Sequence, residues 1–348
     1  SVTARCCVVI AYLVMAAGVL MAGGADEARS DDPPVIGVVH VSLESEFFYQ
    51  DIQYQSFAGS FTTQFERLAT QRGVAVEQVK GGLVYGSVHS AVARILPRVD
   101  GLLLFQHDQS VISEVLNNLT EAPTAIVVHG IRSPGESQVP YVGFDEYDSS
   151  YSLGRQVAET FLAQDEAVGA PAIVILNNRS VESLRLRESG FKDGVRSASP
   201  DANFFDRFQD DGTVEGAQST LEAYLQSGQP VDVVFGTSDF RARGAVLAIE
   251  AHAAIRLAGV GGSIDAMREL LDPDSPWKAE VALNVARAAE VAFDTVLSLM
   301  ESGGADTVAA ETLVDSQVMV RPDLEEVRRY LLENHAIEDV PMTADDER

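Results

Sequence analysis

Cysteine is almost absent from this chain of 348 residues. Its only two cysteines, Cys6 and Cys7, are adjacent and lie near the start of the sequence. The rest of the chain therefore has no disulfide framework and no thiol nucleophile. Hydrophobic residues make up 46% of the chain. Over this length, that fraction suits a globular protein of roughly two domains.

Basic residues are also scarce. The chain has 25 basic and 52 acidic residues, a formal net charge of −27, and only three lysines: Lys80, Lys192 and Lys278. Proteins that bind nucleic acids carry a basic footprint on their surface, so this balance argues against that function. The acidic excess fits a strongly solvated surface or a salt-tolerant source and says little about the fold.

Common catalytic motifs are missing as well. The sequence has no G-x-S-x-G turn, no phosphate-binding G-x-x-x-x-G-K-S/T loop and no H-E-x-x-H pair. The segment "GVGG" at 259–262 follows a predicted strand but lacks the full spacing of a dinucleotide-binding loop. We therefore expect a protein that is not an enzyme and has no cofactor.

The N-terminal segment has the features of an export signal. Arg5 precedes an apolar run rich in small residues, "CCVVIAYLVMAAGVLMAGGA", and the polar "DEARSDDPP" follows. This order predicts a signal peptide at 1–25 that is cleaved after Ala25, then a linker at 26–34. The alternative is an uncleaved membrane anchor, because the run is close to the length of a spanning helix. Either reading places the protein outside the cytoplasm, in the periplasm or an equivalent compartment.

Beyond residue 34, apolar runs of strand length alternate with amphipathic stretches of helix length. The predicted strands are 35–41, 74–79, 101–106, 124–129, 140–144, 172–177, 202–208, 232–236, 255–261 and 312–320. The predicted helices are 53–72, 87–97, 110–119, 149–163, 182–196, 214–227 and 281–302. Continuous β-branched runs are typical of parallel strands buried on both faces, and the alternation occurs twice. We therefore predict an α/β protein with two doubly wound parallel-sheet lobes.

Two adjacent aromatic residues, Phe47 and Phe48, follow the first predicted strand in the polar segment "LESEFFYQDI". Open α/β sheets bind ligands beyond the carboxyl ends of their strands, so two rings there would form a wall for the face of a sugar ring. The alternative is that one ring caps the hydrophobic core and the other covers the next helix.

The segment "IGVVHVSLESEFFYQDI" resembles the first strand and loop of the periplasmic binding proteins of the ribose-binding type. The similarity continues, in order, through "GLLLFQHD", "APTAIVVH", "VGFDEYDSSYSLGRQVAETF", "RLRESGFKDGV", "VDVVFGTSDFRARGAVLAIEA", "IRLAGVGGSIDAM" and "AEVALNVARAAEVAFDTVL". These blocks are collinear over about residues 35–320. The resemblance implies the type 1 fold of that family: two lobes, three crossing segments and a ligand cleft that closes about a hinge.

The resemblance also implies how the chain is divided between the lobes. The N-terminal lobe would comprise 35–145 plus 284–311, and the C-terminal lobe 146–283 plus 312–322. Residues 323–348 would form a C-terminal extension.

Ligand contacts follow from the resemblance position by position. Phe47 and Phe48 match the aromatic pair that stacks on the sugar, and Ser45 stands where an asparagine often contacts it. Arg187 in "RLRESGF" matches the cleft arginine, whose planar set of donors suits ligand hydroxyls. We expect it to matter chiefly in the closed, ligand-bound form. Arg185 is the nearby alternative for this contact. If Arg187 has no ligand contact, it is an arginine on the surface of a helix.

Several second-lobe positions depart from the family. Ser238 falls where an asparagine is usual, and Asp239 follows in the family's place. Gly261 replaces an aspartate that commonly accepts from sugar hydroxyls. Leu283 sits where a glutamine is frequent, which leaves Asn284 as the nearest amide. Either the ligand is not a standard sugar or other residues hold it, and we expect ribose itself to bind weakly.

Three of the six histidines, His40, His107 and His129, lie at or just past the ends of first-lobe strands. His129 stands where the family often has an arginine. The resemblance makes these strands neighbours, so their tips would converge on the cleft, with Glu44 and Asp108 close in sequence. We expect polar contacts with a neutral ligand and no metal. A metal site, which needs three or four such groups within reach, is the alternative.

We therefore predict an exported, monomeric solute-binding protein that captures a small polar ligand, a sugar or sugar-like molecule, for an ABC-type importer. The alternative is a sensor with the same fold that signals to a membrane histidine kinase or chemoreceptor. Regulators resembling the lac repressor share the fold, but they need an N-terminal helix-turn-helix where this chain has the signal-like segment.

Overall fold

The computed structural model describes residues 33–40, 57–81, 85–105, 109–118, 125–129, 139–162, 170–179, 181–208, 213–249, 254–302 and 309–337. The chain divides into two units, residues 1–34 and residues 35–348, and every helix and strand below belongs to the second unit. The predicted signal peptide and most of the predicted linker lie outside the described residues. Within the described residues, no helix is long and apolar enough to cross a membrane.

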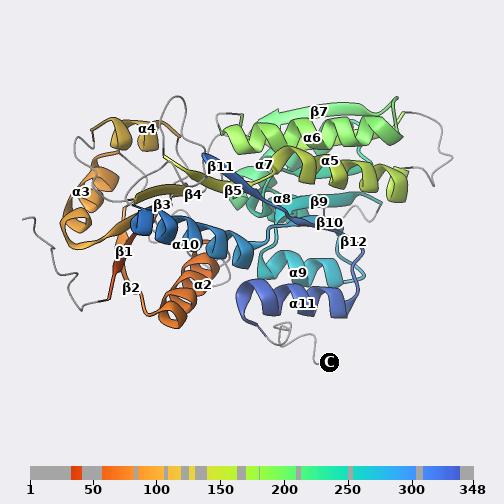
Figure 1. Ribbon diagram of the computed structural model, residues 1–348. Helices are drawn as coiled ribbons and strands as arrows, with labels where there is room; N and C mark the ends of the chain where they lie inside the picture. Colours follow the sequence, from red (N-terminus) through yellow and green to blue (C-terminus); the bar gives the residue numbers. More distant parts are fainter. Residues whose placement is uncertain are drawn as a thin grey trace, which may run out of the picture. The chain divides into compact units, whose positions relative to one another are not determined.

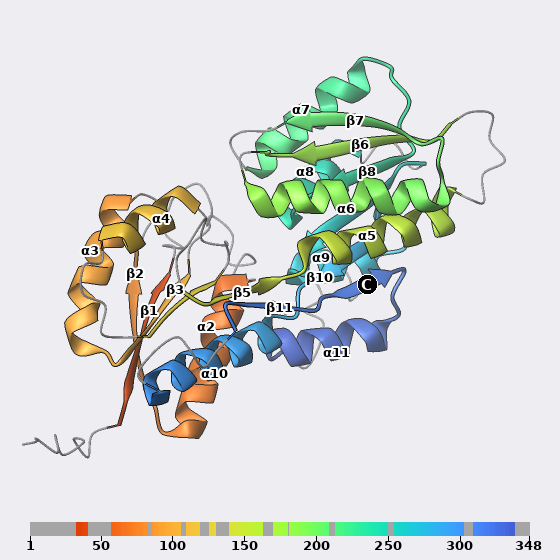
Figure 2. The ribbon, with the colours of Figure 1, turned by 45° about the horizontal axis from the view of Figure 1, so that its top comes forward.

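The first lobe is built on a six-stranded sheet with the order β11-β5-β4-β3-β1-β2, in which every pair of neighbours is parallel (Figures 1 and 2). Its strands are β1 (Val35–His40), β2 (Ala75–Lys80), β3 (Gly101–Phe105), β4 (Ala125–His129), β5 (Tyr141–Phe144) and β11 (Glu311–Val314). Its helices are α2 (Phe57–Arg72), α3 (Tyr85–Ile95), α4 (Gln109–Asn118) and α10 (Val285–Ser302), with a short 3₁₀ turn at Leu96–Arg98.

Helices cover both faces of this sheet, which explains the continuous apolar runs. Successive side chains of a strand point to opposite faces. Leu103 and Phe105 of β3 pack with the α2 and α10 side, whereas Leu102 and Leu104 pack with α3 and α4. A strand buried on both sides needs an apolar residue at every position, as "GLLLF" has.

The second lobe is built on a six-stranded sheet with the order β12-β10-β9-β8-β6-β7. Its strands are β6 (Ala172–Asn177), β7 (Asn203–Phe208), β8 (Val233–Gly236), β9 (Arg256–Gly261), β10 (Trp277–Ala282) and β12 (Gln317–Val320). Its helices are α5 (Glu146–Val157), α6 (Glu182–Ala198), α7 (Val214–Gln226), α8 (Asp239–Ile249), α9 (Ile264–Leu271) and α11 (Leu324–His335), and a π-helical turn at Ala158–Leu162 follows α5. All neighbours are parallel except β12, which is antiparallel to β10. Helices α5 and α6 lie on one face, and the other four helices lie on the opposite face (Figure 1).

Three segments connect the two lobes. Asp145 joins β5 to α5, residues 283–284 join β10 to α10, and residues 315–316 join β11 to β12. The predicted architecture, two doubly wound lobes linked by three crossings, is confirmed.

Two predicted elements near the C-terminus are wrong. The helix predicted at 281–302 begins at Val285, and the segment Trp277–Ala282 before it is the strand β10. The strand predicted at 312–320 is two strands, β11 and β12, which belong to different sheets. Alanine, lysine and glutamate are depleted in strands, so the composition of "WKAEVA" gives only a weak strand signal; pairing with β9 and β12 decides it.

The C-terminal boundaries also differ in detail from those expected. All of β11 pairs with β5, so residues 312–314 lie in the first sheet rather than with the second lobe. The expected extension at 323–348 contains helix α11. Its side chains Val327, Tyr330 and Leu331 are buried in the core of the second lobe. The described part of this segment is therefore integral to that lobe.

Candidate functional site

Polar side chains gather at one edge of the second sheet, where the carboxyl ends of β6, β8, β9 and β10 meet. Buried polar side chains at this edge and directly behind it are Asn177, Arg187, Glu188, Thr237, Asp239, Arg241, Ser263, Asp265 and Glu280. Burying polar groups is unfavourable unless they are hydrogen-bonded, so each needs partners. Such a concentration at the carboxyl edge of a parallel sheet marks a candidate ligand site.

Arg187 lies at this edge and is held by groups of the protein itself. Its Nε and Nη2 donate to the two oxygens of Glu146 over 2.6 and 2.9 Å, and its Nη1 donates to the carbonyl oxygen of Thr237 over 3.0 Å. Burial alone would lower the pKa of Arg187, but the Glu146 carboxylate outweighs burial and keeps this pKa above its usual value. Arg187 therefore has a structural role in addition to any ligand contact. The expectation that it matters chiefly in the ligand-bound form stays a prediction, and these bonds form without a ligand.

The packing of α5 against α6 brings this ion pair together. The two helices approach so closely that a Cβ atom at Gly190 would lie 2.2 Å from the carbonyl oxygen of Tyr147. No side chain fits there, so glycine is needed at this position. The close approach places Glu146, at the start of α5, beside Arg187 on α6.

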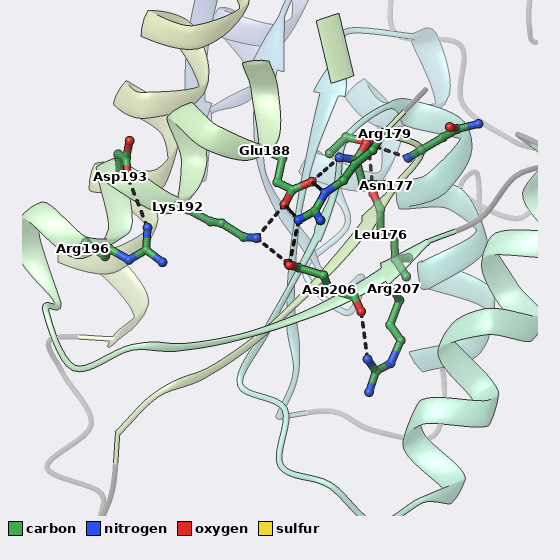
Figure 3. Close-up of polar contacts among 11 residues, drawn as sticks. Leu176, Asn177, Arg179, Glu188, Lys192, Asp193, Arg196, Asp206 and Arg207 are labelled. Carbon is green, nitrogen blue, oxygen red and sulfur yellow. Dashed lines mark hydrogen bonds and ion pairs between the residues drawn. The ribbon is translucent and has the colours of Figure 1, made fainter. Parts of the chain in front are cut away.

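Behind Arg187, the carboxylate of Glu188 holds a second polar cluster (Figure 3). It accepts hydrogen bonds from Arg179, Asn177 and the Nζ atom of Lys192, the last over 2.6 Å. Burial would raise the pKa of Glu188, but these three donors lower it to about 2. Asn177 Oδ1 in turn accepts from the hydroxyl of Thr237 over 3.0 Å. Two consecutive residues of α6 therefore hold Thr237. Arg187 donates to the carbonyl oxygen of Thr237, and Glu188 binds Asn177, whose Oδ1 accepts from the Thr237 hydroxyl.

Asp239 occupies the space above Gly261, the position where the family's aspartate is missing. A Cβ atom at residue 261 would lie 2.4 Å from Asp239 Oδ2, so a side chain at 261 and the present position of Asp239 exclude each other. Asp239 Oδ2 accepts from the backbone N–H of Ser263 over 2.8 Å. Position 261 therefore has no acceptor side chain of its own, but the carboxylate of Asp239 lies next to it.

Glu280, on β10, lies directly behind Asp239 and was not identified from the sequence. It is 0% exposed, and its oxygens accept from the N–H of Gly262 over 2.9 Å and from Trp277 Nε1 over 3.1 Å. Burial, followed by the nearby Asp239 carboxylate, raises the pKa of Glu280 well above its ordinary value. The available signal was an acidic residue in the segment "WKAEVA", but it gave no indication of its partner.

Helix α11 contributes two further polar groups that sequence reasoning missed. The Tyr330 hydroxyl lies 2.9 Å from the carbonyl oxygen of Leu283 and 3.2 Å from that of Gly262. His335 Nε2 lies 3.0 Å from the same Gly262 carbonyl, and its Nδ1 lies 2.8 Å from Ser60 Oγ on α2. A carbonyl only accepts, so Nε2 carries the hydrogen and Nδ1 accepts from Ser60. Burial lowers the pKa of His335, which favours this neutral form.

Two other predicted contacts have structural roles here. The carbonyl of Ser238 accepts from the first turn of α8, and its hydroxyl accepts from Arg241 Nη1 over 2.9 Å. Asn284 Oδ1 accepts from the N–H of Arg287 over 3.2 Å, as a helix N-cap does for α10. Their predicted contacts with a ligand remain predictions.

The first-lobe histidines are placed only in part. His40 and His129 are the last residues of β1 and β4 and flank Phe105 of β3, so these strands are neighbours, as expected. His40 is buried, and its carbonyl accepts from the N–H of Gly81 over 2.7 Å. The described residues contain no group of three or more metal-ligating side chains. Ser45, Phe47, Phe48 and His107 lie outside the described residues, so their predicted ligand contacts are not tested.

A cavity of about 130 Å³ lies beside the Arg187–Glu146 pair. Its lining combines aromatic and apolar side chains from both lobes with carboxylates, among them Tyr141, Phe144, Glu146, Glu182, Leu186 and Glu311. Such a mixture of apolar surface and a few polar groups is typical of sites for small polar molecules.

The sequence identifies the family to which this architecture belongs. A family model described as a periplasmic binding protein domain matches residues 47–304, well over half of the chain. The chain belongs to the periplasmic binding protein family. Its two lobes and three crossings form the type 1 fold of that family, and the predicted family is thereby confirmed. Comparison with curated proteins gives no match.

Several solved structures share this fold. A protein from Mycobacterium smegmatis in complex with β-D-fucofuranose is 20% identical, with a TM-score of 0.68 over 87% of this chain and 95% of that one. An ABC transporter solute-binding protein from Actinobacillus succinogenes with bound D-allose is 17% identical, with a TM-score of 0.69 over 85% and 100%. The arabinose-binding component of an ABC transporter from Shewanella, bound to L-arabinofuranose, is 18% identical, with a TM-score of 0.68 over 87% and 96%. At these identities the likeness shows the fold alone.

Proposed function

We propose that this protein is exported and captures a small, neutral, hydroxyl-rich ligand, a sugar or sugar-like molecule, for an ABC-type importer. The observation that carries the proposal is the buried polar edge of the second sheet, with Arg187 and Asp239 fixed at the strand ends where this fold binds its ligands. Support comes from the family and from three similar proteins whose structures hold fucofuranose, allose or arabinofuranose.

In this proposal the second lobe offers one donor and one acceptor to ligand hydroxyls. Arg187 uses three of its five N–H groups within the protein, which leaves two for a ligand. Asp239 provides the acceptor that the family usually has at position 261. The first lobe would contribute the rings of Phe47 and Phe48 and the strand-end histidines, and the two lobes would close around the ligand as a monomer.

The lining of the second lobe also suggests which ligands are excluded. Arg187 is neutralised by Glu146, whereas Asp239 forms no ion pair within the part of the chain that the structure describes. An ionised acid sugar would bring a second negative charge close to Asp239, which is unfavourable in a partly desolvated site. Neutral sugars and polyols are therefore the proposed class.

Calorimetric titration of the purified protein tests this function. We expect binding of at least one neutral sugar or polyol from a panel that includes D-allose, L-arabinose, D-fucose and myo-inositol, and no binding of D-glucuronate or D-galacturonate. Binding of acid sugars alone, or of no member of the panel, would contradict the proposal. The sensor alternative is separated by the membrane partner: co-purification with a permease supports transport, and co-purification with a histidine kinase supports sensing.

A further inference from the structure

Two carboxyl groups are buried against each other at the second-lobe edge. Glu280 is 0% exposed and Asp239 is 9% exposed, and the two carboxyls accept from the consecutive backbone N–H groups of Gly262 and Ser263, which places them close together. Asp239 Oδ1 is buried and receives no hydrogen bond from any N–H or hydroxyl group of the described residues. Two carboxylates can share a hydrogen bond only when one carries a proton. A proton shared by the two residues would give Asp239 Oδ1 a donor and relieve the repulsion between two buried carboxylates.

The surroundings place that proton on Glu280. Asp239 accepts from the backbone N–H of Ser263 and keeps some contact with solvent, being 9% exposed. Glu280 also accepts two hydrogen bonds, but it is fully enclosed between Gly259, Gly262 and Trp277. Complete desolvation next to a carboxylate is the combination that keeps a carboxylic acid neutral.

We propose that Glu280, in its protonated form, is a positioning residue that holds ionised Asp239 above Gly261 as the ligand acceptor of the second lobe, and that ligand capture therefore weakens as pH rises. This inference rests on the proposed function. Loss of the proton from Glu280 places two negative charges side by side without solvent. Asp239 and the segment 261–263 that it anchors then have to move apart from Glu280, and the acceptor is displaced.

The other ionisable groups around the pair do not reproduce this behaviour. Tyr330 on α11 faces both carboxyls, and burial followed by Asp239 and Glu280 raises its pKa well above its usual value, so it stays neutral. Arg187 on α6 stays charged because of Glu146. His335 on α11 is affected by Asp239, but it gains its proton as pH falls, which is the opposite direction. A loss of ligand affinity as pH rises is therefore expected from the carboxyl pair and not from these other groups.

The sign of the effect on stability follows from the same argument. The pKa of Glu280 is raised in the folded protein relative to 4.5, its ordinary value. The folded state thus holds a proton that the unfolded state releases above pH 4.5. Stability is complete below that value and falls as pH rises toward the folded-state pKa of Glu280.

Glu280→Gln and Glu269→Gln make a matched pair of variants for the test. In Glu280→Gln the amide still donates to Asp239 but cannot ionise, and Trp277 Nε1 keeps its second acceptor, the carbonyl of Ala279. Glu269 lies at the opposite end of the lobe, next to Ser275, and burial raises its pKa as well. Glu269→Gln should therefore change the pH dependence of stability but not that of ligand binding.

Urea unfolding from pH 5 to pH 9 tests the shared proton without any ligand. We expect the free energy of unfolding to fall more steeply with rising pH in the wild type than in Glu280→Gln. Equal slopes of the free energy of unfolding against pH in the two proteins would contradict a proton shared by Asp239 and Glu280.

Titration with D-allose, L-arabinose and myo-inositol over the same pH range tests the link to capture. We expect the affinity of any sugar or polyol that binds to fall by about tenfold or more with rising pH in the wild type and in Glu269→Gln, and to stay nearly constant in Glu280→Gln. A pH profile for Glu280→Gln that matches the wild type would show that the pair has only a structural role and would overturn the proposal. If no probe binds the wild type at any pH, the proposed function fails, whereas the unfolding slopes still decide the shared proton.

Discussion

The two lobes have the same architecture but differ in where their polar side chains lie. Among the described residues, the buried polar side chains of the first lobe are His40 and Gln64, while the second lobe has a connected cluster at its carboxyl edge. In the first lobe, strand β3 stays apolar to its end at Phe105. The second lobe therefore presents a rigid, hydrogen-bonded edge that has no counterpart among the described residues of the first lobe.

This contrast explains why the second lobe tolerates so many charges. Arg187 and Glu188 are each fixed by two or more partners and Asp239 by the N–H of Ser263, so little freedom is lost when a ligand arrives. Preorganised groups are more effective in binding than groups that must first be ordered. We therefore expect substitutions in the polar cluster of the second lobe to change stability, and substitutions of Phe47 and Phe48 in the first lobe to change only ligand binding.

The largest effect is expected from Arg187→Ala. This change leaves the Glu146 carboxylate and the Thr237 carbonyl buried without their donor, so we expect a loss of about 3–5 kcal/mol in the free energy of unfolding. Chemical denaturation measures it. Arg185→Ala, two residues earlier and exposed, serves as the control and should change stability by less than about 0.5 kcal/mol. Equal stability of the two variants would show that the Arg187 network adds nothing to the fold.

Acid should remove the contribution of Glu188. The pKa of Glu188 is lowered to about 2 from 4.5, so its stabilisation is present above pH 4.5 and is lost as pH falls toward 2. At pH 7, Glu188→Gln should be less stable than the wild type by roughly 2–3 kcal/mol. The difference should shrink when unfolding is measured at pH 3. A constant difference at both pH values would assign the loss to packing rather than charge.

The first-lobe aromatic pair should act on binding alone. Phe47→Ala and Phe48→Ala are each expected to weaken binding of a sugar by roughly 1–3 kcal/mol, because stacking buries the face of the ring. The free energy of unfolding should stay close to that of the wild type. Calorimetry and denaturation of the same samples separate the two effects. Wild-type affinity in both variants would contradict stacking and indicate that the two rings pack in the hydrophobic core.

The smallest effect concerns the hydrogen bond that joins the lobes. His335→Gln and Ser60→Ala each remove the bond between Nδ1 and Oγ, and each should cost about 1 kcal/mol at pH 8. The pKa of His335 is lowered by burial, so wild-type stability should decrease as pH falls below 6.5, and His335→Gln should lose this decrease. The double variant should cost less than the sum of the single variants; strict additivity would mean that the two side chains do not interact.

Local sequence determined much of the fold. The continuous apolar runs, such as "VIGVVH" and "AIVILN", are strands buried on both faces, and their alternation with amphipathic helices predicted two parallel sheets. Such runs are informative because burial on both sides demands an apolar residue at each position. The strand order followed from the family resemblance, which also directed attention to Arg187 and Asp239.

Only the tertiary structure decided how those residues are used. The segment "WKAEVA" is a strand because β9 and β12 pair with it, although its alanines, lysine and glutamate are depleted in strands. Asp239 stands above Gly261 because those two residues, 22 positions apart, meet at the ends of neighbouring strands; Glu280 and Tyr330 reach the same place from still farther along the chain. Contacts between distant residues depend on how the sheets and helices pack, and packing of this kind leaves no periodic signal in the sequence.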